Sequence, residues 1–321
     1  MYTNYSQIFK NMQKKKVIVV VGPTASGKSS LAHKIAKEFG GFLISADSRQ
    51  VYKGMDIGTN KDHFIRKRRG LFGQTYLIDG VEEKMIDLVK PNQEFNLDDW
   101  LRETKRLIEK DDRLAIVVGG TSLYISALVE GYELIGGFDN KYRKQLERQL
   151  ETEGLMSLVK KLSEIDPEAD KIIDIENSRR VIRALELYEA TGQIINKEKN
   201  EPEFAFLVLG KSLPREVLYE KIDKRVLEMI DEGLVDEVKS LIKKGYKKSL
   251  SSMTGIGYRQ IVGYLDGEYD LNEAIRLIQR DTRRYAKQQL TWYKRDENIK
   301  WVDSWRQSKE LVEHFLSTQS H

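Results

Sequence analysis

Short apolar segments alternate with amphipathic segments in the first half of the chain. Largely apolar runs, typical of strands buried on both faces of a sheet, occur at 17–21, 41–46, 75–78 and 114–118. The segments 30–39 and 97–110 instead repeat their apolar residues at the spacing of one helix face. Because helices that alternate with strands build parallel sheets, this pattern predicts an α/β fold with a parallel sheet.

The pattern changes twice in the rest of the chain. Residues 136–200 carry charged residues at helical spacing and contain no strand-like run, whereas 204–209 return to an apolar strand. The intervening stretch is therefore predicted to be a helical domain inserted into the core. Further helices are expected at 214–232, 234–244 and 271–294, with a break at Gly255-Ile256-Gly257. The predicted domains are a flexible leader at 1–15, a core formed by 16–135 and 201–321, and a helical insertion at 136–200.

Composition narrows the class of protein. The 321 residues are 40% hydrophobic and 32% charged, as in globular proteins, and no run is long enough to span a bilayer. Cysteine is absent, which excludes disulfides, thiolate metal sites and a cysteine nucleophile. We therefore expect a cytoplasmic protein with no membrane partner, and a monomer because no heptad repeat is present. The basic run 66–69 is interpreted as a solvated loop.

A glycine-rich segment between the first strand and the first helix carries the clearest chemistry. It reads Gly22-Pro23-Thr24-Ala25-Ser26-Gly27-Lys28-Ser29 and matches G-x-x-x-x-G-K-[ST] at every fixed position. Glycines allow backbone N–H groups to surround a phosphate at a helix N-terminus. Lys28 adds a positive charge, and the Ser29 hydroxyl suits Mg²⁺. The segment predicts a polyphosphate site without identifying the molecule that carries the phosphates.

Two other polar loops follow predicted strands and are expected at the same edge of the sheet. Asp47 could hold Mg²⁺ through water, accept a proton from a nucleophile, or cap the next helix. Thr121, after Gly119-Gly120, could present its hydroxyl or act as a helix cap. No apolar run ends in the acidic pair that orients the metal in ATPases and GTPases, so those activities are disfavoured.

Basic residues gather on the predicted helix 271–294. Arg276, Arg280, Arg283 or Arg284, and Lys287 recur at helical spacing and are followed by Trp292-Tyr293. Such a stripe can follow a phosphate backbone while the aromatic rings stack on bases, although a solvated amphipathic helix explains it equally well. A second basic cluster, Arg179-Arg180 with Arg183, lies in the insertion. Together with the polyphosphate loop, these groups favour transfer chemistry on RNA or DNA.

Seven motifs, in this order, resemble those of one known family. They are GPTASGKS at 22–29, DSRQVY with GMDIGT at 47–59, GGTSLY at 119–124, SRRVIRALE at 178–186, IDKRVLEMIDEGLVDEV at 222–238, GIGYRQ at 255–260 and TRRYAKQQLTWYKR at 282–295. The chain is similar to the bacterial tRNA dimethylallyltransferases from about Lys16 to Trp301. The resemblance implies an α/β core of the P-loop type with an inserted helical domain and a helical C-terminal part.

The resemblance also implies an activity. A dimethylallyl group would pass from dimethylallyl diphosphate to N6 of adenosine 37 in tRNAs that read codons beginning with U. The glycine-rich loop would then hold the diphosphate of the donor rather than ATP. Asp47 would accept the proton of the amine and Thr121 would orient the reactants. Lys28, Arg225 of the IDKRV motif and Mg²⁺ bound at Ser29 would stabilise the leaving diphosphate.

The resemblance assigns the tRNA anticodon stem-loop as partner, gripped by the core and by the insertion. The implied RNA-binding residues are Asp47, Ser48, Arg49, Gln50, Thr121, Arg143, Ser178, Arg179, Arg180, Val181, Arg183, Gly257, Tyr258, Arg259, Arg283 and Lys287.

Three alternative functions share parts of these motifs. A small-molecule kinase would place ATP in the loop, but it leaves the basic helical third without a role. A prenyltransferase that acts on free adenine nucleotides would need neither the insertion nor the basic C-terminal helix. A non-enzymatic RNA-binding protein would not need an intact phosphate-binding loop.

Overall fold

The computed structural model describes residues 14–61, 66–70, 73–78, 80–132, 140–194 and 200–318. The chain forms two compact units, one comprising Met1–Val129 with Pro202–His321 and the other Glu130–Glu201. The sequence pattern placed the insertion at 136–200, within the second unit. Most of the leader expected at 1–15 lies outside the described residues.

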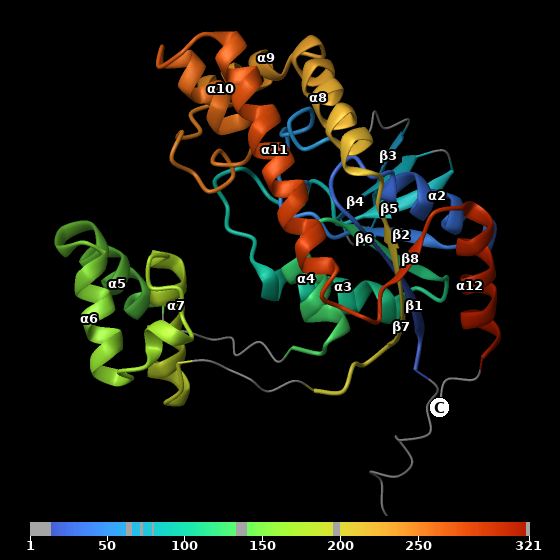
Figure 1. Ribbon diagram of the computed structural model, residues 1–321, viewed down its shortest axis with the longest axis horizontal. Helices are drawn as coiled ribbons and strands as arrows, with labels where there is room; N and C mark the ends of the chain where they lie inside the picture. The colour runs from blue at the N-terminus through green and yellow to red at the C-terminus, as the bar shows by residue number, and fades with distance from the viewer. Residues whose placement is uncertain are drawn as a thin grey trace, which may run out of the picture. The chain divides into compact units, whose positions relative to one another are not determined.

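One eight-stranded sheet, drawn in Figure 1, organises the first unit, in the order β3-β4-β5-β2-β6-β1-β7-β8. Neighbours from β5 to β8 in this order pair in parallel, whereas β4 pairs antiparallel with β3 and β5. The strands are β1 (Lys16–Val21), β2 (Phe42–Ser45), β3 (Arg66–Gly70), β4 (Gly73–Ile78), β5 (Val81–Lys84), β6 (Ala115–Gly119), β7 (Ala205–Lys211) and β8 (Lys300–Val302). The predicted α/β class with a parallel core is confirmed.

Helices pack against the sheet because their apolar faces contact the apolar side chains of the strands. Alternate residues of β1, Ile18 and Val20, pack with Leu31 and Ile35 of α2 and with Val312 of α12. Trp100 of α3 stacks on Tyr124 of α4 with ring centroids 4.8 Å apart, and its indole N–H donates to the Ser45 carbonyl at 2.9 Å. The helices named here are α2 (Lys28–Phe39), α3 (Leu97–Lys110), α4 (Ser122–Val129) and α12 (Trp305–Ser317).

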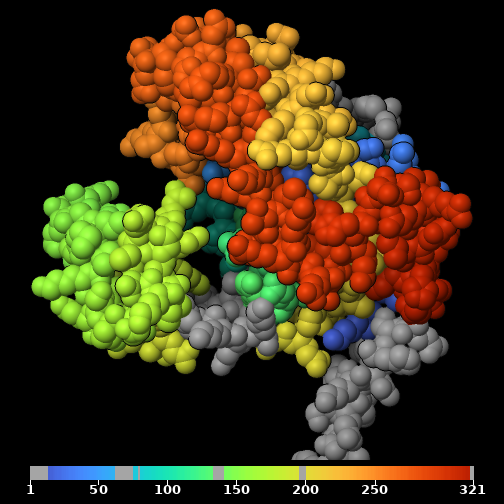
Figure 2. Space-filling view, viewed as in Figure 1, coloured from blue at the N-terminus to red at the C-terminus, as the bar shows by residue number. Residues whose placement is uncertain are grey.

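A second group of helices, yellow to orange in Figures 1 and 2, has its own apolar core. It comprises α8 (Arg215–Asp231), α9 (Leu234–Lys243), α10 (Tyr258–Leu265) and α11 (Leu271–Tyr293). Val51 and Met55, which follow β2, are buried among Val238, Ile261 and Ile278 of these helices. The cluster therefore supports the loops at the end of β2.

The second unit consists of α5 (Asn140–Glu153), α6 (Leu155–Ile165), the short 3₁₀ helix η2 (Ala169–Lys171) and α7 (Ser178–Thr191). Leu146, Leu158, Leu162, Val181 and Leu185 form its core and are fully buried. Each of the three α-helices contributes one apolar face to this core, as the helical spacing of the sequence predicts.

One local prediction was wrong. The basic run 66–69 forms most of β3 rather than a solvated loop, and Arg66 pairs antiparallel with Leu77 of β4. Pairing with β4, the next strand along the chain, outweighs the low strand propensity of charged residues. Charges on an edge strand also oppose edge-to-edge association. Among the described helices, none combines the length and the apolar character needed to cross a bilayer.

Candidate functional site

The glycine-rich loop between β1 and α2 has a backbone that few residues can adopt. Gly22, Ala25 and Gly27 all have positive φ, at 153°, 63° and 86°. A Cβ at Gly22 would lie 2.1 Å from the Lys211 carbonyl oxygen of β7, so a side chain is excluded there. Gly27 is the N-cap of α2, which leaves the first N–H groups of the helix available to an anion.

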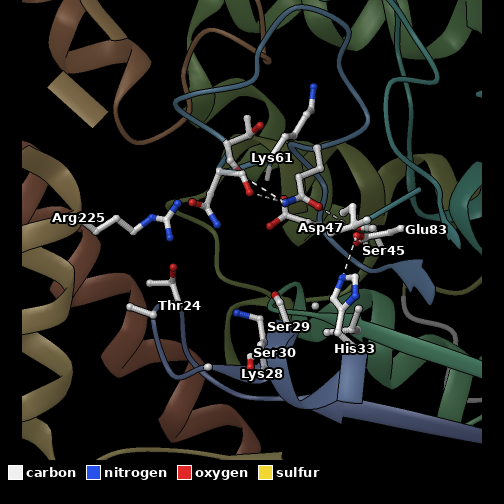
Figure 3. A pocket seen from close by; sticks show the side chains of 18 of the residues that line it. Thr24, Lys28, Ser29, Ser30, His33, Ser45, Asp47, Lys61, Glu83 and Arg225 are labelled. Carbon is white, nitrogen blue, oxygen red and sulfur yellow. Dashed lines mark hydrogen bonds and ion pairs between the residues drawn. The ribbon is translucent and has the colours of Figure 1, made fainter. Parts of the chain in front are cut away.

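A cavity of about 620 Å³ opens above this loop (Figure 3). Lys28 and Ser29 point into it from the start of α2, Asp47 lies opposite, and Arg225 reaches in from α8. Further parts of the wall are built by the end of β6 and by the loop 59–61. The structure thus brings together Lys28, Ser29, Asp47 and Arg225, which the sequence placed in one reaction.

The Lys28 ammonium lies deep in this cavity. Desolvation lowers its pKa to about 8, an effect that Asp47 opposes and the positive charge of Arg225 reinforces. Its Nζ donates to the Pro23 carbonyl at 3.3 Å. A cation held under a desolvation penalty, with one long hydrogen bond, is well placed to bind an incoming anion.

Asp47 begins a tight turn after β2. Its Oδ1 accepts a hydrogen bond from the Arg49 N–H at 2.8 Å, and the Ser48 N–H donates to Thr121 Oγ1 at 3.1 Å. The Thr121 N–H in turn donates to the Ala46 carbonyl at 3.2 Å. One Asp47 oxygen is thus engaged by its own turn, and the Thr121 hydroxyl links this turn to the loop after β6.

Helix α8 presents several basic residues to the cavity. Lys221, Lys224 and Arg225 line it, since spacings of three and four residues place side chains on one helix face. Lys224 is also 3.6 Å from Glu228 of the same helix. Of these three residues, the family resemblance implied a role for Arg225 alone, although Lys221 and Lys224 follow the same helical spacing.

The cavity suits Mg²⁺ bound together with a diphosphate. The Ser29 hydroxyl and the Asp47 carboxylate are oxygen donors, the type that Mg²⁺ prefers, and Mg²⁺ is commonly held by one or two protein groups plus substrate phosphates. Among the described residues, no group of three or more His, Cys, Asp or Glu could hold a metal ion without such a substrate.

Several predicted RNA-binding residues of the core are engaged within the protein. Arg49 donates to the Ser251 carbonyl at 2.5 Å, and Arg259 pairs with Asp281 at 2.7 Å. Arg283 pairs with Asp223 of α8. Tyr258 is buried, at 1% exposure, so its side chain is inaccessible to RNA in this conformation. Gly257, also buried, is the N-cap of α10.

Lys287 is exposed on α11. A surface hollow of about 440 Å³ surrounds it, lined by Arg284, Lys287, Gln288, Thr291, Trp292 and Arg295. All six side chains are exposed. The proposed basic stripe is thus only partly available, since Arg276 pairs with Glu273 and Arg280 with Asp281.

The second unit carries the other predicted RNA-binding residues. Arg179, Arg180 and Arg183 are exposed on α7, with Arg180 3.0 Å from Asp174. Arg143 pairs with Glu147 at 3.0 Å and with Glu186 at 3.2 Å. Ser178 is the first residue of α7, next to the cap Asn177. Val181, fully buried, contributes to the core instead.

Sequence reasoning missed three polar residues that organise the site. Gln289 of α11 contacts the glycine-rich loop. Glu237 of α9 accepts hydrogen bonds from three consecutive N–H groups, at 56–58. Lys61 is buried and pairs with Asp87 at 2.5 Å. Gln289 could have been identified in the sequence as a polar residue at an apolar position of a helix. Its hydrogen-bond partners could not have been identified in this way.

Comparisons with known proteins identify one family. The sequence profile described as IPP transferase matches residues 50–296, and the isopentenyl transferase profile matches 15–84. A tRNA dimethylallyltransferase of Carboxydothermus hydrogenoformans is 41% identical over 315 residues, covering 95% of this chain and 97% of the relative.

Solved structures give the same result. The full-length tRNA isopentenylpyrophosphate transferase of Bacillus halodurans is 37% identical, with a TM-score of 0.65 over 94% of this chain and 95% of its own. A eukaryotic dimethylallyltransferase acting on tRNA is 26% identical, with a TM-score of 0.79 over 95% of this chain and 80% of its own. Sequence profile, overall identity and fold thus concur, and the chain belongs to the IPP transferase family.

Proposed function

We propose that this protein is a tRNA dimethylallyltransferase, which transfers the dimethylallyl group of dimethylallyl diphosphate to N6 of adenosine 37 in tRNAs that read codons beginning with U. The observation that carries the proposal is the cavity that the Lys28 and Arg225 cations line, with the Asp47 carboxylate opposite Lys28. This arrangement offers an anion site and a proton acceptor on either side of a space of substrate size.

The proposed reaction replaces one bond at the allylic C1 atom of the donor. The adenine N6 lone pair forms the N6–C1 bond, the C1–O bond breaks, and the electron pair leaves with the diphosphate. Asp47 accepts one N6 proton, so the product amine is neutral. The lone pair of N6 is delocalised into the purine, which is why a carboxylate that removes the proton as the bond forms aids the attack.

The developing charge on the diphosphate is met by groups already in place. The N–H groups at the start of α2, the Lys28 ammonium and the Arg225 guanidinium need little reorganisation to bind it. Ser29 would hold Mg²⁺ together with the donor phosphates, and this ion would offset the negative charge that develops on the diphosphate. Removal of one such group typically costs about 10²–10³-fold in rate.

The RNA must deliver an unstacked base to this cavity. Extrusion of adenosine 37 from the anticodon loop costs a few kcal/mol, which contacts to the phosphate backbone and neighbouring bases repay. The exposed cations of α11 and of α7 supply such contacts in each unit. We propose that the protein acts as a monomer in the cytoplasm, where tRNA is found.

The decisive experiment is single-turnover transfer from labelled dimethylallyl diphosphate to an undermodified anticodon stem-loop with adenosines at 36–38. AMP and ATP as acceptors test the free-nucleotide prenyltransferase. ATP as the phosphoryl donor tests the kinase. Label in the RNA alone, lost on replacing adenosine 37, supports the proposal, whereas label in AMP or no transfer contradicts it.

The variant Asp47→Asn tests the proton acceptor. The amide preserves the size of the side chain but cannot take up a proton, so we expect a loss of about 10²–10⁴-fold in the single-turnover rate. Binding of the donor should change little. A rate within a few-fold of the unsubstituted protein would eliminate Asp47 as the acceptor.

A further inference from the structure

The amide of Gln289 joins two loops that are far apart in the sequence. Its Oε1 accepts a hydrogen bond from the Thr24 N–H at 2.9 Å, and its Nε2 donates to the Gly120 carbonyl at 2.8 Å. The side chain is buried, at 4% exposure. Both ends of one amide are thus satisfied, one by the glycine-rich loop and the other by the loop after β6.

The loop after β6 continues the connection to Asp47. Thr121, next to Gly120, bonds the Ala46 carbonyl through its N–H and accepts from the Ser48 N–H through its hydroxyl. Ala46 and Ser48 flank Asp47. A continuous hydrogen-bonded path therefore runs from the diphosphate loop, through Gln289, to the turn that holds the carboxylate.

The backbone at Gly120 is shaped around this amide. A Cβ at position 120 would lie 2.2 Å from Gln289 Nε2 and 3.8 Å from Lys28 Nζ. Any side chain there would displace the amide. The Gln289 amide therefore occupies the space that a side chain at position 120 would need, close to the Lys28 ammonium.

We propose that Gln289 is a positioning residue which sets the distance between the donor loop and the loops that hold the acceptor base. The inference rests on the proposed transferase function. In-line displacement requires the attacking nitrogen close to C1 and opposite the leaving oxygen, and a displacement of about 1 Å can cost about 10²-fold in rate. Gln289 contacts neither reactant in this scheme and acts through the two loops.

Only an amide of this length satisfies both partners. Methionine fills a similar volume but forms neither hydrogen bond, which leaves the Gly120 carbonyl without its closest donor; Tyr285 OH lies 3.5 Å away. Glutamate can accept from Thr24 but places a carboxylate oxygen against the Gly120 carbonyl. Gln289→Met therefore releases both loops, whereas Gln289→Glu retains one contact and makes the other repulsive.

A matched control exists on the same helix. Gln279 of α11 also donates its amide N–H to a backbone carbonyl, that of Asp223 in α8, at 3.2 Å, but it does not line the cavity. Gln279→Met removes a comparable hydrogen bond from the α8–α11 packing. Any loss that comes only from loosening α11 should appear in both variants.

The experiment measures single-turnover transfer to the stem-loop, donor KM and binding of inorganic pyrophosphate, well below the melting temperature of every variant. For Gln289→Met we expect a rate loss of about 10–100-fold with pyrophosphate affinity within about threefold. Gln289→Glu should lower the rate and also weaken pyrophosphate binding, because its charge lies near the diphosphate. Gln279→Met should leave the rate within about twofold.

The outcomes separate the two proposals. Absence of transfer by the unsubstituted protein refutes the proposed function, whatever the variants do. An active unsubstituted protein with Gln289→Met at the same rate, or with equal losses in Gln289→Met and Gln279→Met, overturns the positioning role. A loss of pyrophosphate affinity equal to the rate loss in Gln289→Met would also overturn it, since the residue would then serve binding of the anion alone.

Discussion

Lys28 and Asp47 share one cavity, and the Asp47 carboxylate favours the charged form of Lys28. Burial lowers the pKa of Lys28 to about 8, and the nearby Asp47 carboxylate limits this decrease. The site therefore holds a cation at a cost to the folded protein, a cost that a bound anion can recover. Charged groups whose pKa is shifted by burial are common at sites where proteins bind charged ligands.

Replacing the Lys28 ammonium should stabilise the protein while weakening its donor site. Below pH 8 the ammonium is charged in both the folded and unfolded states, so the folded state bears the full desolvation cost. Between pH 8 and 10.5 the unfolded chain binds more protons, and the stability of the unsubstituted protein rises with pH. Lys28→Met should raise Tm by about 2–4 °C at pH 7, and the difference should vanish above pH 10.5. Calorimetry across this range measures it, and an unchanged or lower Tm at pH 7 contradicts it.

Donor binding should take up a proton at alkaline pH. The diphosphate favours the charged form of Lys28, so its pKa rises from about 8 when the donor binds. Affinity should consequently fall as pH increases above 8, by at most tenfold per pH unit. Titration calorimetry of dimethylallyl diphosphate in two buffers of different ionisation enthalpy measures the proton uptake. Lys28→Met is the control and should show none of this uptake, and equal uptake by both proteins would assign the proton to another group.

The Glu237 carboxylate holds the loop 56–58 beside the cavity. It accepts from the N–H groups of Asp56 and Ile57 at 2.8 and 2.9 Å, from that of Gly58 at 3.3 Å, and from Tyr258 OH at 2.6 Å. Glu237→Gln leaves one acceptor oxygen for four donors, so the free energy of unfolding should fall by about 1–3 kcal/mol. Denaturant unfolding, with hydrogen exchange at 56–60, measures the effect.

Asp236→Asn is the control for this substitution. Asp236 is the neighbour of Glu237 on α9, is largely exposed and lies 3.5 Å from Lys239. Its replacement should change the unfolding free energy by less than about 0.5 kcal/mol. Similar effects of the two substitutions would show that loss of charge on α9, rather than loss of the loop contacts, governs stability.

Local pattern determined some elements of the fold and left others open. The helix 97–110 was predicted with its observed bounds, because its apolar spacing is strong and Asn96 and Asp99 form a capping box at its start. The strand at 66–70 was missed because its partner β4 decides the conformation. Sequence spacing likewise grouped Lys28 and Asp47 at strand ends, which parallel topology brings together.

The contacts of Gln289 could not be predicted in the same way. Its partners Thr24 and Gly120 lie 265 and 169 residues away, and no periodic pattern encodes such a pairing. The three possible roles of Asp47 also remained open in sequence, since a metal-binding aspartate, a proton acceptor and a helix cap look alike. The structure shows that one carboxylate oxygen serves the turn, through Arg49 N–H, and this does not prevent the other from facing a substrate.

The exposed hollow on α11 should bind the RNA backbone. Lys287 and Arg295 are exposed there beside Trp292, a residue that is 45% exposed and whose Nε1 donates to Ser126 Oγ at 3.3 Å. Each cation that neutralises one phosphate contributes about one unit to the slope of log affinity against log salt. We expect Lys287→Ala and Arg295→Ala each to weaken stem-loop binding and to reduce that slope by about one, with donor affinity unchanged.

Trp292→Leu separates stacking from charge on the same surface. Loss of a stacked base should cost about 1–3 kcal/mol of RNA affinity without altering the salt slope. Arg306→Ala is the control, because the Arg306 side chain is 89% exposed on α12 and forms a local ion pair with Glu310 at 2.9 Å. Fluorescence anisotropy of a labelled stem-loop between 50 and about 200 mM salt measures all four variants. If the hollow does not contact RNA, the stem-loop affinity and its salt slope should be the same in Lys287→Ala, Arg295→Ala and Trp292→Leu as in Arg306→Ala.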